Sequence, residues 1–200
     1  PDAFNALSSE LMTALQHSLD AVAQDPHARV VVLSANGKAF CAGHDLREMR
    51  ASPSLAYYQA LFHQCSQMMM SVQRLPVPVI AVVNGIATAA GCQLVAMCDL
   101  AVASQTSKFA VSGVNLGLFC STPSVALSRN LSRKAAFEML VTGDFITAEQ
   151  ALVKGLVNAV VAPEALDDAV QRYVESILAK PRTAIAMGKK LFYEQLEQPL

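Results

Sequence analysis

Apolar and polar positions alternate along this chain in patterns that predict helices and strands in turn. Leu11, Leu15, Leu19 and Val22 recur at helical spacing, which predicts a helix over residues 8–24. Similar patterns and capping residues predict further helices at about 54–74, 88–98, 132–141, 147–155 and 163–180. Runs of β-branched and apolar residues predict buried strands at 29–36, 77–85, 99–104 and 156–161, with another short strand within 108–120. This alternation predicts an α/β fold, and the length of 200 residues favours a single domain over 1–200.

One segment, from Leu75 to Cys98, has no charged residue and is long enough to cross a bilayer. Prolines, glycines and amides interrupt it, at Pro76, Pro78, Asn84, Gly85, Gly91 and Gln93. A buried strand, a turn and a buried helix therefore explain this segment better than a membrane span. Asp99 directly follows it, between the predicted helix and the next strand, and we expect a structural role for this residue.

Composition and charge exclude several classes of function. Lys and Arg number 15 against 16 Asp and Glu, a net charge of −1, which provides no basic surface for nucleic acid or for an anionic membrane. Apolar residues make up 53% of the chain and charged residues 16%, which argues against disorder and favours burial of apolar surface against other subunits. The five cysteines form no CxxC pair, which favours a reduced intracellular compartment over a disulfide framework. His17, His27 and His63 lack metal-ligand spacing, and we expect no metal site.

Two loops have the residue types of a binding site. Cys41–Asp45 and Asn84–Gly91 each follow a predicted strand and precede a predicted helix. Their small residues let a ligand approach the backbone, and N–H groups at a helix start bind anions or a carbonyl oxygen that becomes negative. Two ordinary tight turns would have the same pattern, so the residues alone leave both interpretations open.

Several motifs, in order along nearly the whole chain, carry a resemblance to a known family. They are Asn5-Ala-Leu7, Phe40-Cys-Ala-Gly-His-Asp-Leu46, Pro78-Val-Ile-Ala-Val-Val-Asn-Gly85, Ala90-Gly-Cys-Gln-Leu94, Cys98-Asp99, Thr142-Gly-Asp144, Ala148-Glu-Gln-Ala151 and Gly155-Leu-Val157. On these motifs the chain resembles the crotonase superfamily, also called the enoyl-CoA hydratase/isomerase family. The resemblance implies a spiral of ββα units with stacked sheets, assembled as a homotrimer or a dimer of trimers. Compared with the family pattern, we expect two parts to be missing from this sequence. They are a first strand before Pro1 and the helices after Leu200 that help to build the trimer.

The resemblance also implies a ligand and a site. The backbone N–H groups of His44 and Ala90 match the pair that holds the thioester oxygen of an acyl-CoA and stabilises the adjacent enolate. A coenzyme A thioester is thus the implied substrate or ligand, with no permanently bound cofactor. Asp2 matches a position near the CoA phosphates that is often basic, and this departure puts the CoA affinity in doubt. The residues that the resemblance implies for contact with the acyl-CoA are Ala3, Ala42, Gly43, His44, Asp45, Leu46, Gly85, Ala89, Ala90, Gly91, Val114 and Leu118.

Both acidic groups of the family's hydratases are replaced in this chain. Hydration of an enoyl thioester needs one group that activates water and another that delivers a proton to the α-carbon. Gln93 and Gly113 stand at the two glutamate positions of the resemblance. An amide orients water but does not transfer a proton at neutral pH, and glycine has no side chain. These two residues put hydratase chemistry in doubt.

His44 and Cys120 are the remaining reactive groups near the implied site. An acyl-CoA decarboxylase of the family shares the Ala-Gly-His-Asp phrase and has a tyrosine where this chain has Cys120. A thiol with a lowered pKa donates a proton or acts as a nucleophile, whereas a buried thiol is usually inert. His44 has two interpretations as well. Its side chain either titrates within the site, or it turns to solvent and only the backbone N–H of His44 contacts the ligand.

Three functions therefore compete at the level of sequence. The chain is a hydratase or isomerase that uses Gln93 and water, a decarboxylase or thioesterase-like enzyme that uses His44 and Cys120, or a non-catalytic acyl-CoA-binding protein. The expected compartment is the cytoplasm of a bacterium or, in a eukaryote, the mitochondrial matrix.

Overall fold

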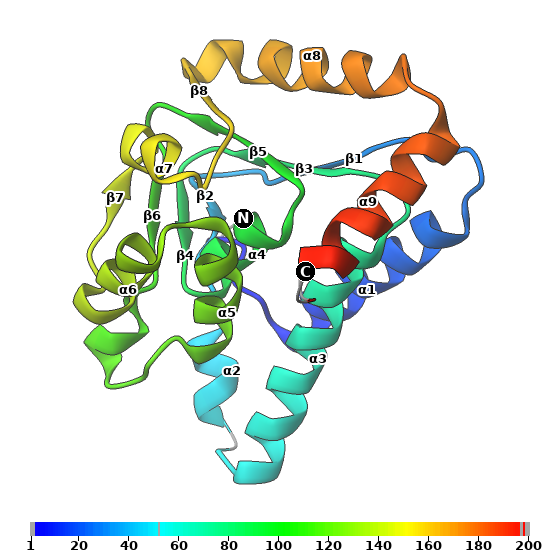
Figure 1. The fold of residues 1–200 in the computed structure, drawn as a ribbon. Helices are drawn as coiled ribbons and strands as arrows, with labels where there is room; N and C mark the ends of the chain where they lie inside the picture. Colours follow the sequence, from blue (N-terminus) through cyan, green and yellow to red (C-terminus); the bar gives the residue numbers. More distant parts are fainter. Residues whose placement is uncertain (1–2, 52, 197, 199–200) are drawn as a thin grey trace.

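Two stacked four-stranded sheets form the centre of the computed structural model, which describes residues 3–51, 53–196 and 198 (Figure 1). The first sheet has the order β1 (Val31–Ser34), β3 (Val79–Val83), β5 (Leu100–Ser104) and β8 (Ala159–Val161). The second sheet has the order β2 (Ala39–Cys41), β4 (Ile86–Thr88), β6 (Lys108–Ala110) and β7 (Ile146–Thr147). All neighbouring strands are parallel except β6 and β7, so the carboxyl ends lie along one edge in the first sheet and, in the second sheet, along one edge for β2, β4 and β6.

Helices follow each pair of strands and cover the sheets. The described helices are α1 (Ser9–Gln24), α2 (Leu46–Ala51), α3 (Leu55–Arg74), α4 (Ala90–Met97), η1 (Ser112–Leu116), α5 (Ser121–Asn130), α6 (Arg133–Thr142), α7 (Ala148–Lys154), η2 (Pro163–Ala165), α8 (Leu166–Leu178) and α9 (Arg182–Leu196). Each ββα unit contributes one strand to each sheet before its helices, in the series β1-β2-α2, β3-β4-α4 and β5-β6-α5. This arrangement confirms the predicted α/β spiral of ββα units.

The hydrophobic core explains why the strands of the first sheet are apolar throughout. Val79, Ala81 and Val83 of β3 face the larger cluster, which fills the space between the sheets and extends to α1, α3 and α4. Ile80 and Val82 face the opposite way and pack under α8 in a second cluster. A strand buried on both faces has no polar face, which is the pattern that predicted it.

Short strands lie where the sequence predicted only loops. The sequence predicts a loop at Cys41–Asp45 and no strand directly before it, but β2 occupies Ala39–Cys41. The expected turn Asn84–Gly91 likewise contains β4, and α4 begins at Ala90 rather than at Thr88. A strand of three residues shows no period, and β2 and β4 are defined by their pairing with each other.

Two helices were missed entirely. The first is α5, which begins with Ser-Thr-Pro-Ser, residues that do not favour helix interiors, and which packs on α4. The second is α9, which has no fully buried residue. The segment expected as one helix over 163–180 is divided into η2 and α8. Within the described ranges, no helix combines the length and hydropathy needed to cross a membrane.

Candidate active site

The two loops that the sequence singled out lie directly against each other. A Cβ added to Gly43, whose φ is +90°, would lie 2.9 Å from Ala89 Cβ and 3.4 Å from the nitrogen of Ala90. A Cβ added to Gly91 would lie 2.1 Å from the carbonyl oxygen of Cys41. Only glycine allows this approach, so the small residues serve to pack one loop on the other. The site is thus formed where β2 leads into α2 and β4 leads into α4.

Two backbone N–H groups at this junction have no acceptor within the described part of the chain. The neighbouring groups are paired, since Leu7 N–H donates to Gly43 O at 2.7 Å and Ala89 N–H donates to Ala110 O at 3.0 Å. The N–H groups of His44 and Ala90 donate to none of the residues that the structure describes. Ala90 is the first residue of α4, where the helix itself supplies no acceptor and the helix dipole is positive.

Gln93 places an amide beside the same helix terminus. Only 5% of its surface is exposed, and its Oε1 has no hydrogen-bond partner among the described residues. Helical side chains lean toward the helix N-terminus, and residues three apart share a face, so Gln93 extends over the turn that holds Ala90. Buried amide oxygens without a partner are rare in native proteins, and this one indicates a position for a ligand or water.

Gly113 lies next to the two loops and has no room for a side chain. Its segment is joined to β4 by a hydrogen bond between Thr88 Oγ1 and Ser112 Oγ, 3.1 Å apart. A Cβ at Gly113 would lie 2.7 Å from Cys120 Sγ and 2.7 Å from Leu118 O. A glutamate at this position would therefore require the segment before α5 to move.

Cys120 occupies the space beside Gly113 as a protonated thiol. Burial raises the pKa of the Cys120 thiol, while a hydrogen bond with the backbone of Gly113 lowers it by a smaller amount. The lowered pKa that a nucleophilic role needs is absent, and a raised pKa also makes the thiol a weaker proton donor. Burial also raises the pKa values of Cys41, Cys65 and Cys92, to about 11, about 12 and about 12.

The His44 ring packs into the protein instead of turning to solvent. It meets Phe62 of α3 edge to face, with ring centroids 5.4 Å apart, and its Nδ1 is buried without a hydrogen-bond partner. Burial lowers the pKa of His44, while the backbone of Leu7 and the charge of Glu48 oppose this shift. A ring with a lowered pKa is neutral at pH 7 and presents both a donor and an acceptor nitrogen.

The other predicted contact residues are distributed unevenly. Ala42 lies in the first loop, where its N–H donates to Phe4 O, and Asp45 Oδ1 accepts from Arg47 N–H at the start of α2. Gly85 lies at the opposite end of β4 from Ala89, where a Cβ would be 2.2 Å from Lys38 O. Leu46 and Leu118 are largely exposed, Val114 is half-buried in η1, and Ala3 is exposed in the first described turn. Asp2 lies outside the described residues.

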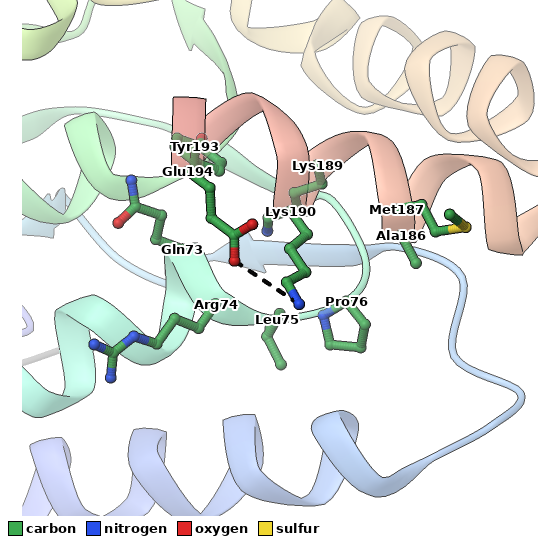
Figure 2. A pocket seen from close by; sticks show the side chains of 10 residues that line it. All are labelled: Gln73, Arg74, Leu75, Pro76, Ala186, Met187, Lys189, Lys190, Tyr193 and Glu194. Atoms are coloured by element: carbon green, nitrogen blue, oxygen red, sulfur yellow. Dashed lines mark ion pairs between the residues drawn. The ribbon is translucent and has the colours of Figure 1, made fainter. Parts of the chain in front are cut away.

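A separate groove of about 560 Å³ lies between the end of α3 and α9 (Figure 2). None of its lining residues belongs to the two loops; they are Gln73, Arg74, Leu75, Pro76, Ala186, Met187, Lys189, Lys190, Tyr193 and Glu194. No group of three metal-ligating side chains that could hold an ion occurs in the part of the chain that the structure describes.

Comparison with known proteins decides the family. The family model described as enoyl-CoA hydratase/isomerase matches residues 1–200. The chain belongs to the enoyl-CoA hydratase/isomerase family. Among curated relatives of this family, rat enoyl-CoA hydratase domain-containing protein 3, mitochondrial, is 47% identical over 196 residues, which is 98% of this chain. The chain spans 65% of the length of that relative.

Solved structures of the family superpose closely on this fold. An enoyl-CoA hydratase from Mycobacterium smegmatis is 64% identical with a TM-score of 0.99, over 100% of this chain and 78% of that one. Human enoyl-CoA hydratase domain-containing protein 3 is 46% identical with a TM-score of 0.96, over 100% and 79% of the two chains. The predicted resemblance to the family is confirmed.

Proposed function

We propose that this protein binds an acyl-CoA thioester and stabilises the enolate formed next to the thioester carbonyl. The thioester oxygen would accept hydrogen bonds from the N–H groups of His44 and Ala90. The observation that carries the proposal is that these two groups, on loops in direct contact, have no acceptor among the described residues. Preorganised donors in a site that excludes water stabilise an oxyanion better than water does.

The side chains around the two donors favour an enolate reaction other than hydration by two carboxylates. Gln93 is an amide, and the space next to Gly113 is occupied by Cys120 Sγ and Leu118 O. Neither position supplies the pair of proton-transferring groups that water addition requires. The first reaction that we propose is therefore hydration or isomerisation of an acyl-CoA in which Gln93 orients a bound water.

A specific observation favours a second form, decarboxylation or thioester cleavage. Decarboxylation generates its own enolate and needs only a proton donor afterwards. The Cys120 thiol lies beside Gly113 and would deliver that proton, while the neutral ring of His44 would act only as a hydrogen-bond donor or acceptor. A non-catalytic acyl-CoA-binding protein would retain the donors without either reaction. We assign the protein to the cytoplasm if it is bacterial and to the mitochondrial matrix if it is eukaryotic.

A turnover screen tests the proposal. The protein would be incubated with enoyl-, 3-hydroxyacyl-, malonyl-type and saturated acyl-CoAs, and the products identified by mass spectrometry. Ala90→Pro removes one N–H donor at a helix position that tolerates proline, and it should lower turnover about 100- to 1000-fold. Arg133→Pro is the matched control, because Arg133 is the exposed first residue of α6 and should leave turnover unchanged.

Infrared difference spectroscopy of a ¹³C-labelled thioester gives a readout that needs no variant. Hydrogen bonds from two N–H groups should shift the carbonyl stretch of bound acyl-CoA to lower frequency than in water. An unshifted carbonyl band on the bound thioester would rule out the two-donor arrangement. Hydration of an enoyl-CoA would instead show that the missing carboxylates do not prevent water addition.

A further inference from the structure

Two buried polar atoms have no hydrogen-bond partner among the described residues, one in the loop before α2 and one in α3. They are Nδ1 of His44 and the hydroxyl oxygen of Tyr57, which is in the first turn of α3. Native interiors leave few polar atoms unpaired, because each costs the solvation that it has lost. Two such atoms on neighbouring elements therefore suggest positions that a polar group of a ligand completes.

Contacts between the elements place the two atoms in the same region. The neighbouring Tyr58 donates its hydroxyl to Met49 O at 3.1 Å, which holds the first turn of α3 against α2. One turn further along α3, the ring of Phe62 lies edge to face with the ring of His44. The negative charge of the Glu48 carboxylate of α2 raises the pKa of His44 and of Tyr57, although burial has the larger effect on each.

The charges around the two atoms restrict the group that fits between them. The negative charges of Asp45 and Glu48 both raise the pKa of Tyr57. They therefore disfavour a carboxylate of the ligand at this position. Glu48 already accepts from the backbone N–H and the hydroxyl of Ser9, so it offers little to an incoming cation. A hydroxyl both donates and accepts, and it pairs with a neutral imidazole and a phenol in either tautomer of the ring.

We propose that His44 Nδ1 and the Tyr57 hydroxyl form a specificity subsite that selects acyl groups bearing a hydroxyl on carbon 4 or 5. The inference rests on the proposed function, because the thioester oxygen must lie at the His44 N–H for the acyl chain to pass the His44 ring. Carbons 1 and 2 form the enolate at the donors, so a hydroxyl that reaches beyond the ring lies at least two carbons further on. Phe62 and the ring of Tyr57 contact the alkyl portion.

Isosteric ligands and a conservative variant test this inference. Isothermal titration calorimetry would compare 4-hydroxybutyryl-CoA with pentanoyl-CoA, and 5-hydroxypentanoyl-CoA with hexanoyl-CoA, against free CoA. The unmodified protein should bind the better hydroxyacyl-CoA about 10-fold more tightly than its alkyl isostere. Tyr57→Phe should abolish most of that preference and leave the affinity for the alkyl isostere within about 2-fold.

Tyr58→Phe is the matched control, because its hydroxyl is already paired with Met49 O and it should keep the preference. Tyr57→Phe should fold normally, since the hydroxyl that it removes has no partner in the described ranges. Equal binding of the isosteres, or a preference that survives in Tyr57→Phe, would overturn the subsite alone. Failure of every acyl-CoA to bind more tightly than CoA would overturn the subsite together with the proposed function.

Discussion

Ala89 adopts a backbone conformation that glycine ordinarily occupies, with φ 52° and ψ −121°. It immediately precedes Ala90, so the strained residue sets the direction of the free N–H at the start of α4. Strain of this kind costs about 1–3 kcal/mol and persists where the surroundings determine the conformation. Here the surroundings are the Ala89 N–H bond to Ala110 O and the close packing against Gly43.

Ala89→Gly should therefore stabilise the protein. Relief of the strain exceeds the added entropy of glycine in the unfolded chain, which leaves a gain of about 1 kcal/mol in the free energy of unfolding. Urea denaturation followed by circular dichroism measures this change. Ala87→Gly, in the neighbouring strand β4 and without a positive φ, should lower the stability instead. A loss of stability in both variants would show that Ala89 is not strained.

At the scale of elements, α9 is attached to the fold by polar contacts. Asp99 accepts from Val79 N–H at 2.7 Å, from Lys189 Nζ at 2.7 Å and from the Tyr193 hydroxyl at 2.8 Å. Lys189 Nζ also donates to Val77 O at 3.0 Å. The predicted structural role of Asp99 is confirmed, and it consists of joining α9 to the start of β3 beside the groove in Figure 2.

Lys189→Met should release α9 while the sheets remain folded. The side chains of Lys189 and Asp99 are 7% and 13% exposed, and removal of one partner of a buried pair costs about 3–5 kcal/mol. Hydrogen exchange followed by mass spectrometry should show lost protection over residues 182–196 and retained protection in β3 and β5. Lys190→Met is the control, since its pair with Glu194 is exposed and contributes about 0–1 kcal/mol. Unchanged protection of α9 in Lys189→Met would show that other contacts hold the helix.

At the scale of the whole molecule, residues 116–145 carry many exposed apolar side chains. They come from η1, α5, α6, the segments between them and the turn after α6: Leu116, Leu118, Phe119, Val125, Phe137, Val141 and Phe145. A monomeric soluble protein rarely leaves so many large apolar side chains together in water. We propose that these apolar side chains pack against other copies of the chain in the homotrimer or dimer of trimers that the family resemblance implies.

Phe137→Asp should dissociate that assembly. Phe137 is 59% exposed, and a carboxylate at a buried apolar interface would be left without a partner. Sedimentation velocity should show a trimer or a dimer of trimers for the unmodified protein and smaller species for Phe137→Asp. Val153→Asp is the matched control, because Val153 is 87% exposed on α7 and should leave the mass unchanged. A monomer for the unmodified protein would refute the assembly.

The sequence by itself determined the α/β class, the long elements and the family. These properties follow from local periodicity, capping residues and ordered motifs, each of which is written within a few neighbouring positions. The same signals predicted the two loops and the departures at Gln93 and Gly113. They did not predict β2, β4, α5 or α9, because pairing and packing with distant residues define those elements.

Only the tertiary structure decided how the loops become a site. The contact of Gly43 with Ala89 and the space that Cys120 fills beside Gly113 join residues far apart in the chain. The unpaired atoms of His44 and Tyr57 follow from the packing of α2 on α3, and no local pattern signals them. Whether a polar group is paired depends on all its neighbours in space, while a sequence pattern reports only its neighbours along the chain.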